Sequence, residues 1–170
     1  MRTGTLFASA LAAGLLLAAA RSDAIVTDNT DWACSTRETL KVSGAPAARD
    51  EYSGIELSFD GEGNFSLYLP EEDTFYGGTV TAKGKTGFLG TPDASSVEDL
   101  RVYVEEQIQF LTGAESVDVA TFTWSIKGKV KNDELKAVLK AKGKGSIVLG
   151  GRTRKGAGKL TEALVGSPAV

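Results

Sequence analysis

The sequence predicts a mainly β fold, an antiparallel β-barrel or β-sandwich of about eight strands with one amphipathic helix inserted mid-chain. Several segments alternate between apolar and polar residues, which is the period of a half-buried strand. One segment, residues 96–112, instead repeats its apolar residues every three or four positions, as one face of a helix does. Glycine supplies 20 of the 170 residues and punctuates the alternating segments, as turns between strands require.

The first twenty residues have the layout of a secretory signal peptide. A short basic start precedes an apolar run that ends at Ala20, and the run is shorter than the roughly 20 apolar residues that a transmembrane helix needs. We expect cleavage after Ala20 or Ala24, and hence a secreted or periplasmic protein. Residues 21–37 are polar and without periodicity, so we expect a flexible lead-in to a single β-rich domain over residues 38–166.

The first strongly patterned part of that domain is a β-hairpin. A strand at 39–43 and a loop over 44–53 precede two runs, 55–60 and 65–69, in which apolar and polar residues alternate. The short segment between the two runs contains glycines, which supply the positive φ angles that hairpin turns require. The pattern therefore predicts that the two runs pair with each other.

The period changes in the middle of the chain. Residues 76–88 still alternate and predict one long strand or two strands broken at Gly84. The helical period then holds over residues 96–112. The segment 95–98, Ser-Ser-Val-Glu, fits a capping box at the start of this helix, and Gly113 is suited to end it.

A second hairpin is predicted in the last third of the chain. Apolar residues alternate on both sides of Asn132 and Asp133, a candidate two-residue turn. Centring on this turn pairs Val130 with Leu135, Gly128 with Ala137, Ile126 with Leu139 and Trp124 with Ala141. Large residues opposite small ones suit a curved or closed sheet. Segments 147–149 and 160–165 predict one or two last strands around a basic, glycine-rich loop.

The composition excludes many kinds of site. Histidine is absent and Cys34 is the single cysteine, so a histidine base, an intramolecular disulfide and a multi-cysteine metal site are all excluded. We expect no cofactor and no metal. In an oxidising compartment, Cys34 is either buried as a small apolar residue or forms an intermolecular disulfide that links a dimer.

The sequence favours a non-catalytic protein while leaving an enzymatic role open. Serines are frequent, but no spacing pairs one with a lysine or carboxylate base. The densest acidic groups, at 71–73 and 105–106, consist of neighbours in sequence, which do not converge on a substrate, and we expect Glu105 and Glu106 on a solvated helix face. No motif assigns the chain to a family.

A ligand site inside the barrel is the first functional hypothesis. The parity of the strands places seven apolar residues on one inner face, as candidate ligand-binding residues. They are Phe59, Phe65, Leu67, Val80, Phe122, Trp124 and Ile126. Barrels of about eight strands can hold one small ligand, so we expect a carrier of a hydrophobic or amphipathic small molecule. A filled core is the alternative for the same residues.

An anionic partner is the second hypothesis, because the charges are unevenly divided. Residues 25–118 contain 18 acidic and 6 basic residues, whereas residues 119–170 contain 3 acidic and 11 basic residues. The candidate anion-binding residues are Lys127, Lys129, Lys131, Lys136, Lys140, Lys142, Arg152 and Arg154. They suit a structural or adhesive envelope protein that associates with anionic surfaces or with itself. Nucleic acid is not expected, because Phe122 and Trp124 point inward and leave no aromatic platform for bases.

Overall fold

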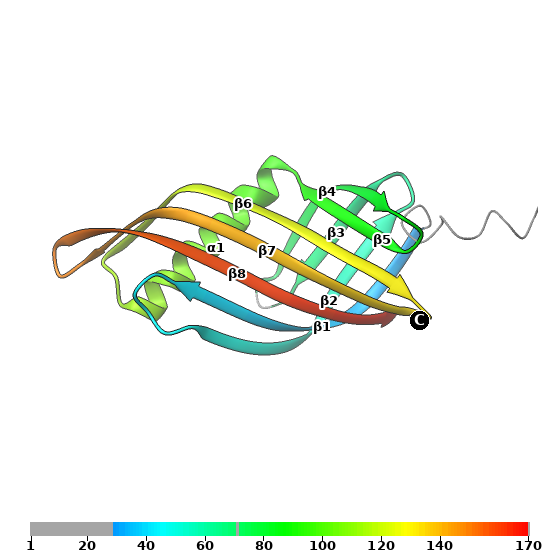
Figure 1. Cartoon of the computed structure of the whole chain (residues 1–170), viewed down its shortest axis with the longest axis horizontal. Coiled ribbons are helices and arrows are strands. Elements are labelled where there is room, and N and C mark those ends of the chain that lie inside the picture. Colours follow the sequence, from blue (N-terminus) through cyan, green and yellow to red (C-terminus); the bar gives the residue numbers. More distant parts are fainter. Residues whose placement is uncertain (1–28, 71, 170) are drawn as a thin grey trace, which may run out of the picture.

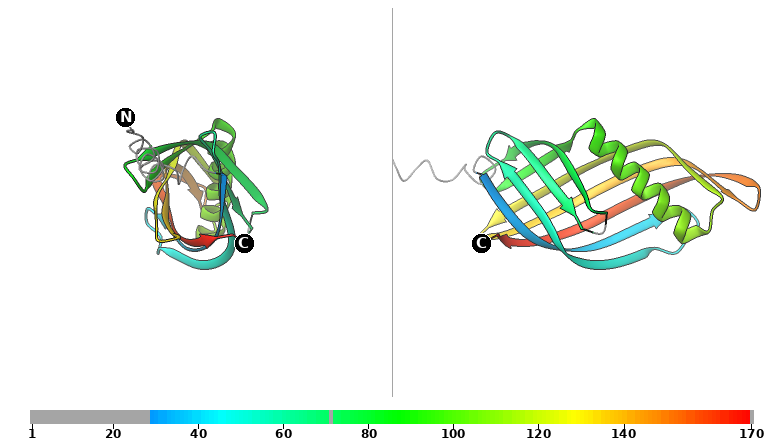
Figure 2. Two further views of the ribbon diagram at one scale, coloured as in Figure 1. Left: turned by 90° about the vertical axis from the view of Figure 1, so that its right-hand side faces the viewer. Right: turned by 180° about the vertical axis from the view of Figure 1, so that it is seen from behind.

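Eight antiparallel strands close into a barrel in the computed structural model, which describes residues 29–70 and 72–169 (Figure 1). The strands are β1 (Asn29–Val42), β2 (Ala48–Asp60), β3 (Asn64–Leu69), β4 (Thr74–Lys83), β5 (Gly87–Pro92), β6 (Ser116–Lys131), β7 (Glu134–Leu149) and β8 (Arg152–Pro168). Each strand pairs with its neighbours in sequence, and β1 pairs with β8 to close the ring, which Figure 2 shows end-on. Of the two architectures that the sequence allowed, the barrel is confirmed.

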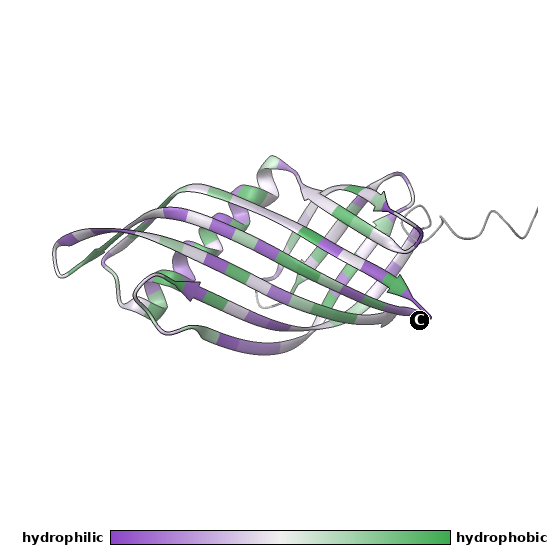
Figure 3. Cartoon of the chain, in the orientation of Figure 1, coloured by the Kyte–Doolittle hydropathy of each residue, from purple (hydrophilic) through white to green (hydrophobic). Residues whose placement is uncertain are grey.

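The alternation of side chains fills the barrel with apolar groups and covers its outside with polar ones. Figure 3 shows this alternation as stripes that cross the strands. Inside, the rings of Phe59 and Phe88 meet edge-to-face with their centroids 5.0 Å apart, and those of Phe65 and Trp124 with theirs 6.1 Å apart. Each large apolar side chain that is fully buried contributes about 1.5–3 kcal/mol to the stability of the fold.

Both predicted hairpins are confirmed, and the second has the predicted register. Leu57 pairs with Leu67 across β2 and β3, and the four pairs expected between β6 and β7 all form. The turn residues Asn132 and Asp133 have φ angles of 53° and 56°, which asparagine and aspartate tolerate better than most residues. The break at Gly84, with φ 68°, separates β4 from β5.

Small residues make room for the aromatic side chains inside. A Cβ atom on Gly128 would lie 2.6 Å from Cζ of Phe88 and 2.7 Å from Cβ of Ala137. Likewise, a Cβ atom on Gly90 would lie 2.5 Å from a methyl carbon of Ile126. These approaches are closer than carbon atoms tolerate, so glycine is required where the aromatic rings fill the barrel.

Several strands extend beyond their predicted bounds. Residues 147–149, predicted to contribute a last strand, instead form the end of β7. Residues 29–37, expected in the flexible lead-in, form the first half of β1, and residues 48–53, expected in a loop, begin β2. The basic, glycine-rich segment 152–159 is strand rather than loop, after a turn at Gly150 and Gly151. The reason is long-range pairing, because β1 pairs with both β2 and β8 along most of its length. The predicted signal peptide and residues 21–28 lie outside the described residues.

Helix α1 (Ala94–Thr112) connects β5 to β6 and begins slightly earlier than predicted. Its N-cap is Asp93 rather than Ser95, because the Asp93 carboxylate accepts a hydrogen bond from the backbone N–H of Ser96 at 2.7 Å. Gly113 ends the helix in the left-handed conformation, with φ 64°, as predicted. The buried stripe on α1 includes Leu100, Val104 and Ile108. None of the helices in the described chain has the length and apolar character needed to cross a membrane.

Three hydrogen bonds fasten α1 to the barrel. Ser96 Oγ accepts from the backbone N–H of Gly77 at 2.7 Å, and the Ser96 carbonyl accepts from Nε1 of Trp124 at 3.1 Å. Further along, Oε1 of Glu105 accepts from the backbone N–H of Val119 at 2.6 Å. The prediction that Glu105 lies on a solvated face is therefore wrong. Its side chain is 19% exposed, because the β-bulge of β6 near Val119 presents an N–H to it.

The ring of strands has two short ladders, β2 with β3 and β5 with β6, and only the second joins strands that are not connected by a hairpin turn. β5 pairs with β6 only where Gly87–Gly90 face Ile126–Lys129, whereas β6 and β7 pair almost from end to end. The chain between β5 and β6 is occupied by α1, which packs against β4 and β6.

Candidate functional site

Two carboxyl groups face each other inside the barrel. Glu38 on β1 and Glu162 on β8 are directly opposite in the strand register, and both point inward. Their exposed fractions are 8% and 0%. Like charges directly opposite in neighbouring strands repel each other, so this pair is costly when both groups are ionised.

Glu162 is the most unusual polar group in the molecule. Within the described part of the chain, neither oxygen of its carboxyl group has a hydrogen-bond partner. Burial raises the pKa of Glu162 well above the ordinary value, and the nearby carboxyls of Glu38 and Glu72 raise it further. Such a shift favours the protonated form of the carboxyl, whereas a cation nearby would favour its ionised form.

A third carboxyl group and two tyrosines complete this region. Burial, followed by the charges of Glu38 and Glu106, raises the pKa of Glu72 to about 8. Tyr76 donates a hydrogen bond from its hydroxyl to Oε2 of Glu72. The Tyr52 hydroxyl donates to Oε2 of Glu38 at 3.1 Å. Burial, with the charges of Glu162 and Glu38, raises the pKa of Tyr52 above its usual value. We refer to Glu38, Glu72 and Glu162 as the acidic cluster.

A hollow of about 590 Å³ lies between the start of β4 and α1. Its lining includes Glu72, Tyr76, Asp99, Val102, Tyr103 and Glu106. Glu72 and Tyr76 belong both to the hollow and to the contacts of the acidic cluster, so the hollow leads toward the cluster. None of the described side chains that line it is basic.

This arrangement suits an organic cation. The described residues contain no group of three or more carboxylate or thiol side chains placed to hold a metal ion. An ammonium group, by contrast, can donate three hydrogen bonds to separate carboxyl or hydroxyl oxygens. Tyrosine rings beside the carboxyls add attraction for a cation through their π faces.

The seven predicted ligand-binding residues are brought together by the fold. Six of them are buried and Phe122 is partly buried, and all belong to one contacting core. Trp124 packs edge-to-face on Tyr76, with ring centroids 6.0 Å apart, so this apolar group adjoins the acidic cluster. Phe65 lies close against Gly78 and Gly90 and Phe88 against Gly128, so the core is tightly packed there, whereas the hollow lies beside Glu72 and Tyr76.

The predicted anion-binding residues lie on the three strands β6, β7 and β8, and all of them are exposed. Lys127, Lys129, Lys136 and Lys140 line a single outer groove. The other four, Lys131, Lys142, Arg152 and Arg154, lie on the same three strands but do not line the groove.

The sequence interpretation missed Glu38 and Glu162, although a signal for both was present. Glu162 lies between Leu160 and Leu164 in a predicted strand, so its parity already placed it on the apolar face. Glu38 holds the corresponding place before Leu40 in β1. A charged residue at an inward position of an alternating strand is therefore the pattern that marks this site.

Cys34 lies on the inner face of β1. Its thiol is 5% exposed and donates a weak hydrogen bond to the Trp32 carbonyl, with sulfur and oxygen 3.6 Å apart. Burial raises the pKa of the Cys34 thiol to about 11. The thiolate that attacks disulfides is therefore scarce near neutral pH. A dimer linked through Cys34 stays a prediction.

The sequence matches no protein-family model and no curated protein. The function is therefore argued from the chemistry of the chain itself.

Proposed function

We propose that this protein is an exported, non-catalytic binding protein that carries a small amphipathic ammonium compound in its barrel. The observation that carries the proposal is Glu162, a fully buried carboxyl with no hydrogen-bond partner among the described residues, directly opposite Glu38. A buried polar group left without a partner costs about 1–3 kcal/mol, and an ammonium group offers both the missing hydrogen bonds and a compensating charge.

The hollow supports an amphipathic ligand rather than a purely polar one. Glu72 and Tyr76 lie on its inner side, where an ammonium group can meet the acidic cluster. Val102 and the Tyr103 ring offer apolar contact to the remainder of the ligand. Val102 is 40% exposed, and a bound alkyl chain would cover it.

Binding of a cation is expected to release protons. Glu72, with a pKa of about 8, and Glu162, whose pKa is also raised, are protonated in part or fully at neutral pH without a ligand. An ammonium ion favours their ionised forms and so displaces protons. If one proton is displaced, the affinity rises about tenfold for each pH unit between pH 5 and pH 8, where alkylammonium ions remain charged.

The test compares three probes that share one alkyl chain, namely octylammonium, octanol and octanoate. Trp124 packs on Tyr76, which lines the hollow, so its fluorescence is a suitable reporter. A Trp32→Phe background leaves Trp124 as the single tryptophan. We expect octylammonium to bind at least tenfold more tightly than the other two probes at pH 7.5, and we expect its affinity to fall at pH 5.

Two substitutions connect that selectivity to the acidic cluster. Glu162→Gln and Glu72→Gln should each weaken octylammonium binding by tenfold or more and flatten its pH dependence. Glu62→Gln removes the same charge from an exposed position between β2 and β3 and serves as the matched control. Equal binding of all three probes would contradict the proposal, as would identical affinities in the three variants.

A further inference from the structure

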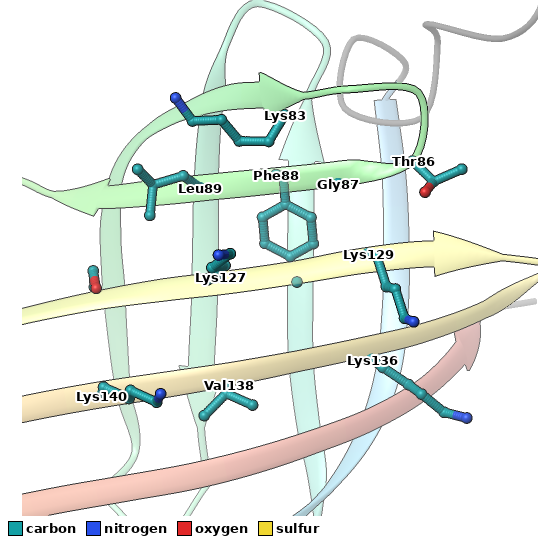
Figure 4. A pocket seen from close by; sticks show the side chains of 12 residues that line it. Lys83, Thr86, Gly87, Phe88, Leu89, Lys127, Lys129, Lys136, Val138 and Lys140 are labelled. Carbon is teal, nitrogen blue, oxygen red and sulfur yellow. The ribbon is translucent and has the colours of Figure 1, made fainter.

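The outer face of the barrel carries a second hollow, which is lined by lysines instead of carboxyl groups. A groove of about 640 Å³ runs over β5, β6 and β7. Lys83, Lys127, Lys129, Lys136 and Lys140 lie along it, around the apolar side chains of Leu89 and Val138 (Figure 4).

The strand register explains how the groove forms. Two neighbouring rows of outward-pointing residues cross β5, β6 and β7. The first row is Leu89, Lys127 and Val138, and the second is Gly87, Lys129 and Lys136. Gly87 contributes no side chain to the outer surface, so its row is open between the lysines. In the first row Lys127 lies between Leu89 and Val138, so ammonium groups lie both between and beside the two apolar side chains.

The charges of these lysines are poorly compensated within the chain. Lys129 and Lys136 are directly opposite in the register, an unfavourable arrangement for like charges. Among the described residues, one groove lysine has an acidic partner: Nζ of Lys136 lies 3.0 Å from Oε2 of Glu134. Glu162, one of the three acidic residues after residue 118, points into the barrel and leaves the outer face basic.

We infer that this groove docks the protein on the head groups of an anionic phospholipid bilayer. Lysines attract phosphate groups, and Leu89 and Val138 can contact the glycerol and upper acyl region between them. Val165, 47% exposed on β8 beside Lys136, extends the apolar part of the surface. Nucleic acid fits less well, because Phe88, the aromatic residue at the groove, is fully buried and offers no face for a base.

A protein bound to a bilayer through this groove can keep the hollow beside α1 open to solvent. In Figure 1, β7 and β8 lie in front and α1 behind, and the view from behind in Figure 2 shows α1 nearest the viewer. A bilayer on the β5–β7 groove would therefore face away from much of the acidic helix. Electrostatic repulsion of that helix from the same bilayer favours this orientation.

Vesicle co-sedimentation of the mature protein tests this inference. We expect binding to vesicles of phosphatidylcholine mixed with phosphatidylglycerol, little binding to phosphatidylcholine alone, and release by salt. Each lysine near an anionic bilayer strengthens binding about fivefold, so a variant with Lys129→Gln, Lys136→Gln and Lys140→Gln should bind about 100-fold more weakly.

Two further variants separate the groove from general charge. Lys142→Gln, Lys155→Gln and Lys159→Gln remove the same charge from β7 and β8 outside the groove, and we expect a loss of less than tenfold. Leu89→Ser changes no charge and should weaken vesicle binding several-fold while leaving binding to soluble dextran sulfate unchanged.

Three results would overturn the inference. Equal losses in the two triple variants would mean that net charge alone acts. Binding to dextran sulfate without binding to anionic vesicles would indicate a soluble polyanion as the partner. Self-association in analytical ultracentrifugation, abolished by the groove variant, would show that the groove binds a second copy of the chain.

Discussion

Replacing Glu162 by glutamine should stabilise the protein at alkaline pH, although the substitution is made in the core. In the folded chain, burial and the neighbouring carboxyls raise the pKa of Glu162 well above its ordinary value. The unfolded chain releases this proton near pH 4.3. Between pH 5 and pH 8 the folded state therefore binds more protons than the unfolded state, and stability falls as the pH rises.

The magnitude follows from this proton difference. Each proton that the folded chain retains lowers the free energy of unfolding by about 1.4 kcal/mol for each pH unit above pH 5, so retention as far as pH 8 lowers it by about 4 kcal/mol. For a domain of this size, 1 kcal/mol corresponds to roughly 2–4 °C in Tm, so the expected decrease is roughly 8–16 °C. Glu72, with a pKa of about 8, acts in the same direction.

The assay is thermal unfolding by circular dichroism at several pH values in this window. Glutamine has the shape of the protonated glutamate, so Glu162→Gln and the wild type should have similar Tm values at pH 5 and diverge above it. The carboxyls with lowered pKa values, such as Asp60 and Asp93, lose their stabilising charge only below about pH 4, outside the window. Parallel Tm curves for the wild type and Glu162→Gln would refute the reasoning, and Glu62→Gln should leave the slope unchanged.

Three further predictions concern packing, reactivity and capping. Gly128→Ala places a methyl group against Phe88 and Ala137 and should cost about 1–3 kcal/mol in urea unfolding, and an unchanged midpoint would show that the core yields easily. Cys34, with its thiol pKa near 11, should react with Ellman's reagent at pH 8 far more slowly in the folded protein than in guanidinium. Equal reaction rates would contradict its burial. Asp93→Ala removes the cap of α1 and should cost about 1 kcal/mol, whereas Asp93→Asn should recover most of it, and equal losses would mean that the cap hydrogen bond is not the cause.

The sequence was most informative where structure is local. The two-residue turn at Asn132 and Asp133 fixes the register of β6 against β7, because each later pair follows from the turn by counting. The segment 152–159 gave no such signal, since its lysines, arginines and glycines do not alternate. It becomes a strand because it pairs with residues 142–149 of β7, and its last two residues, Gly158 and Lys159, also pair with β1.

The candidate site depends on long-range geometry in the same way. The inward direction of Glu162 could be predicted from Leu160 and Leu164, but its opposition to Glu38 required the closure of β1 on β8. The hollow required the packing of α1 beside β4, which no local pattern specifies. The lysines, in contrast, could be assigned to the outer face from the sequence, because each lies at a polar position of an alternating strand.

The short junction between β5 and β6 determines how the barrel can fail. Opening there would break only the short ladder between Gly87–Gly90 and Ile126–Lys129, and it would convert the barrel into an open sheet with β5 and β6 as bare edges. Such edges are templates for strand addition and fibril growth. Lys127, Lys129 and Lys131 lie along the β6 edge, where their mutual repulsion would oppose the stacking of neighbouring chains. Lys127 and Lys129, which also line the outer groove, would thereby help to protect a partly opened barrel from aggregation.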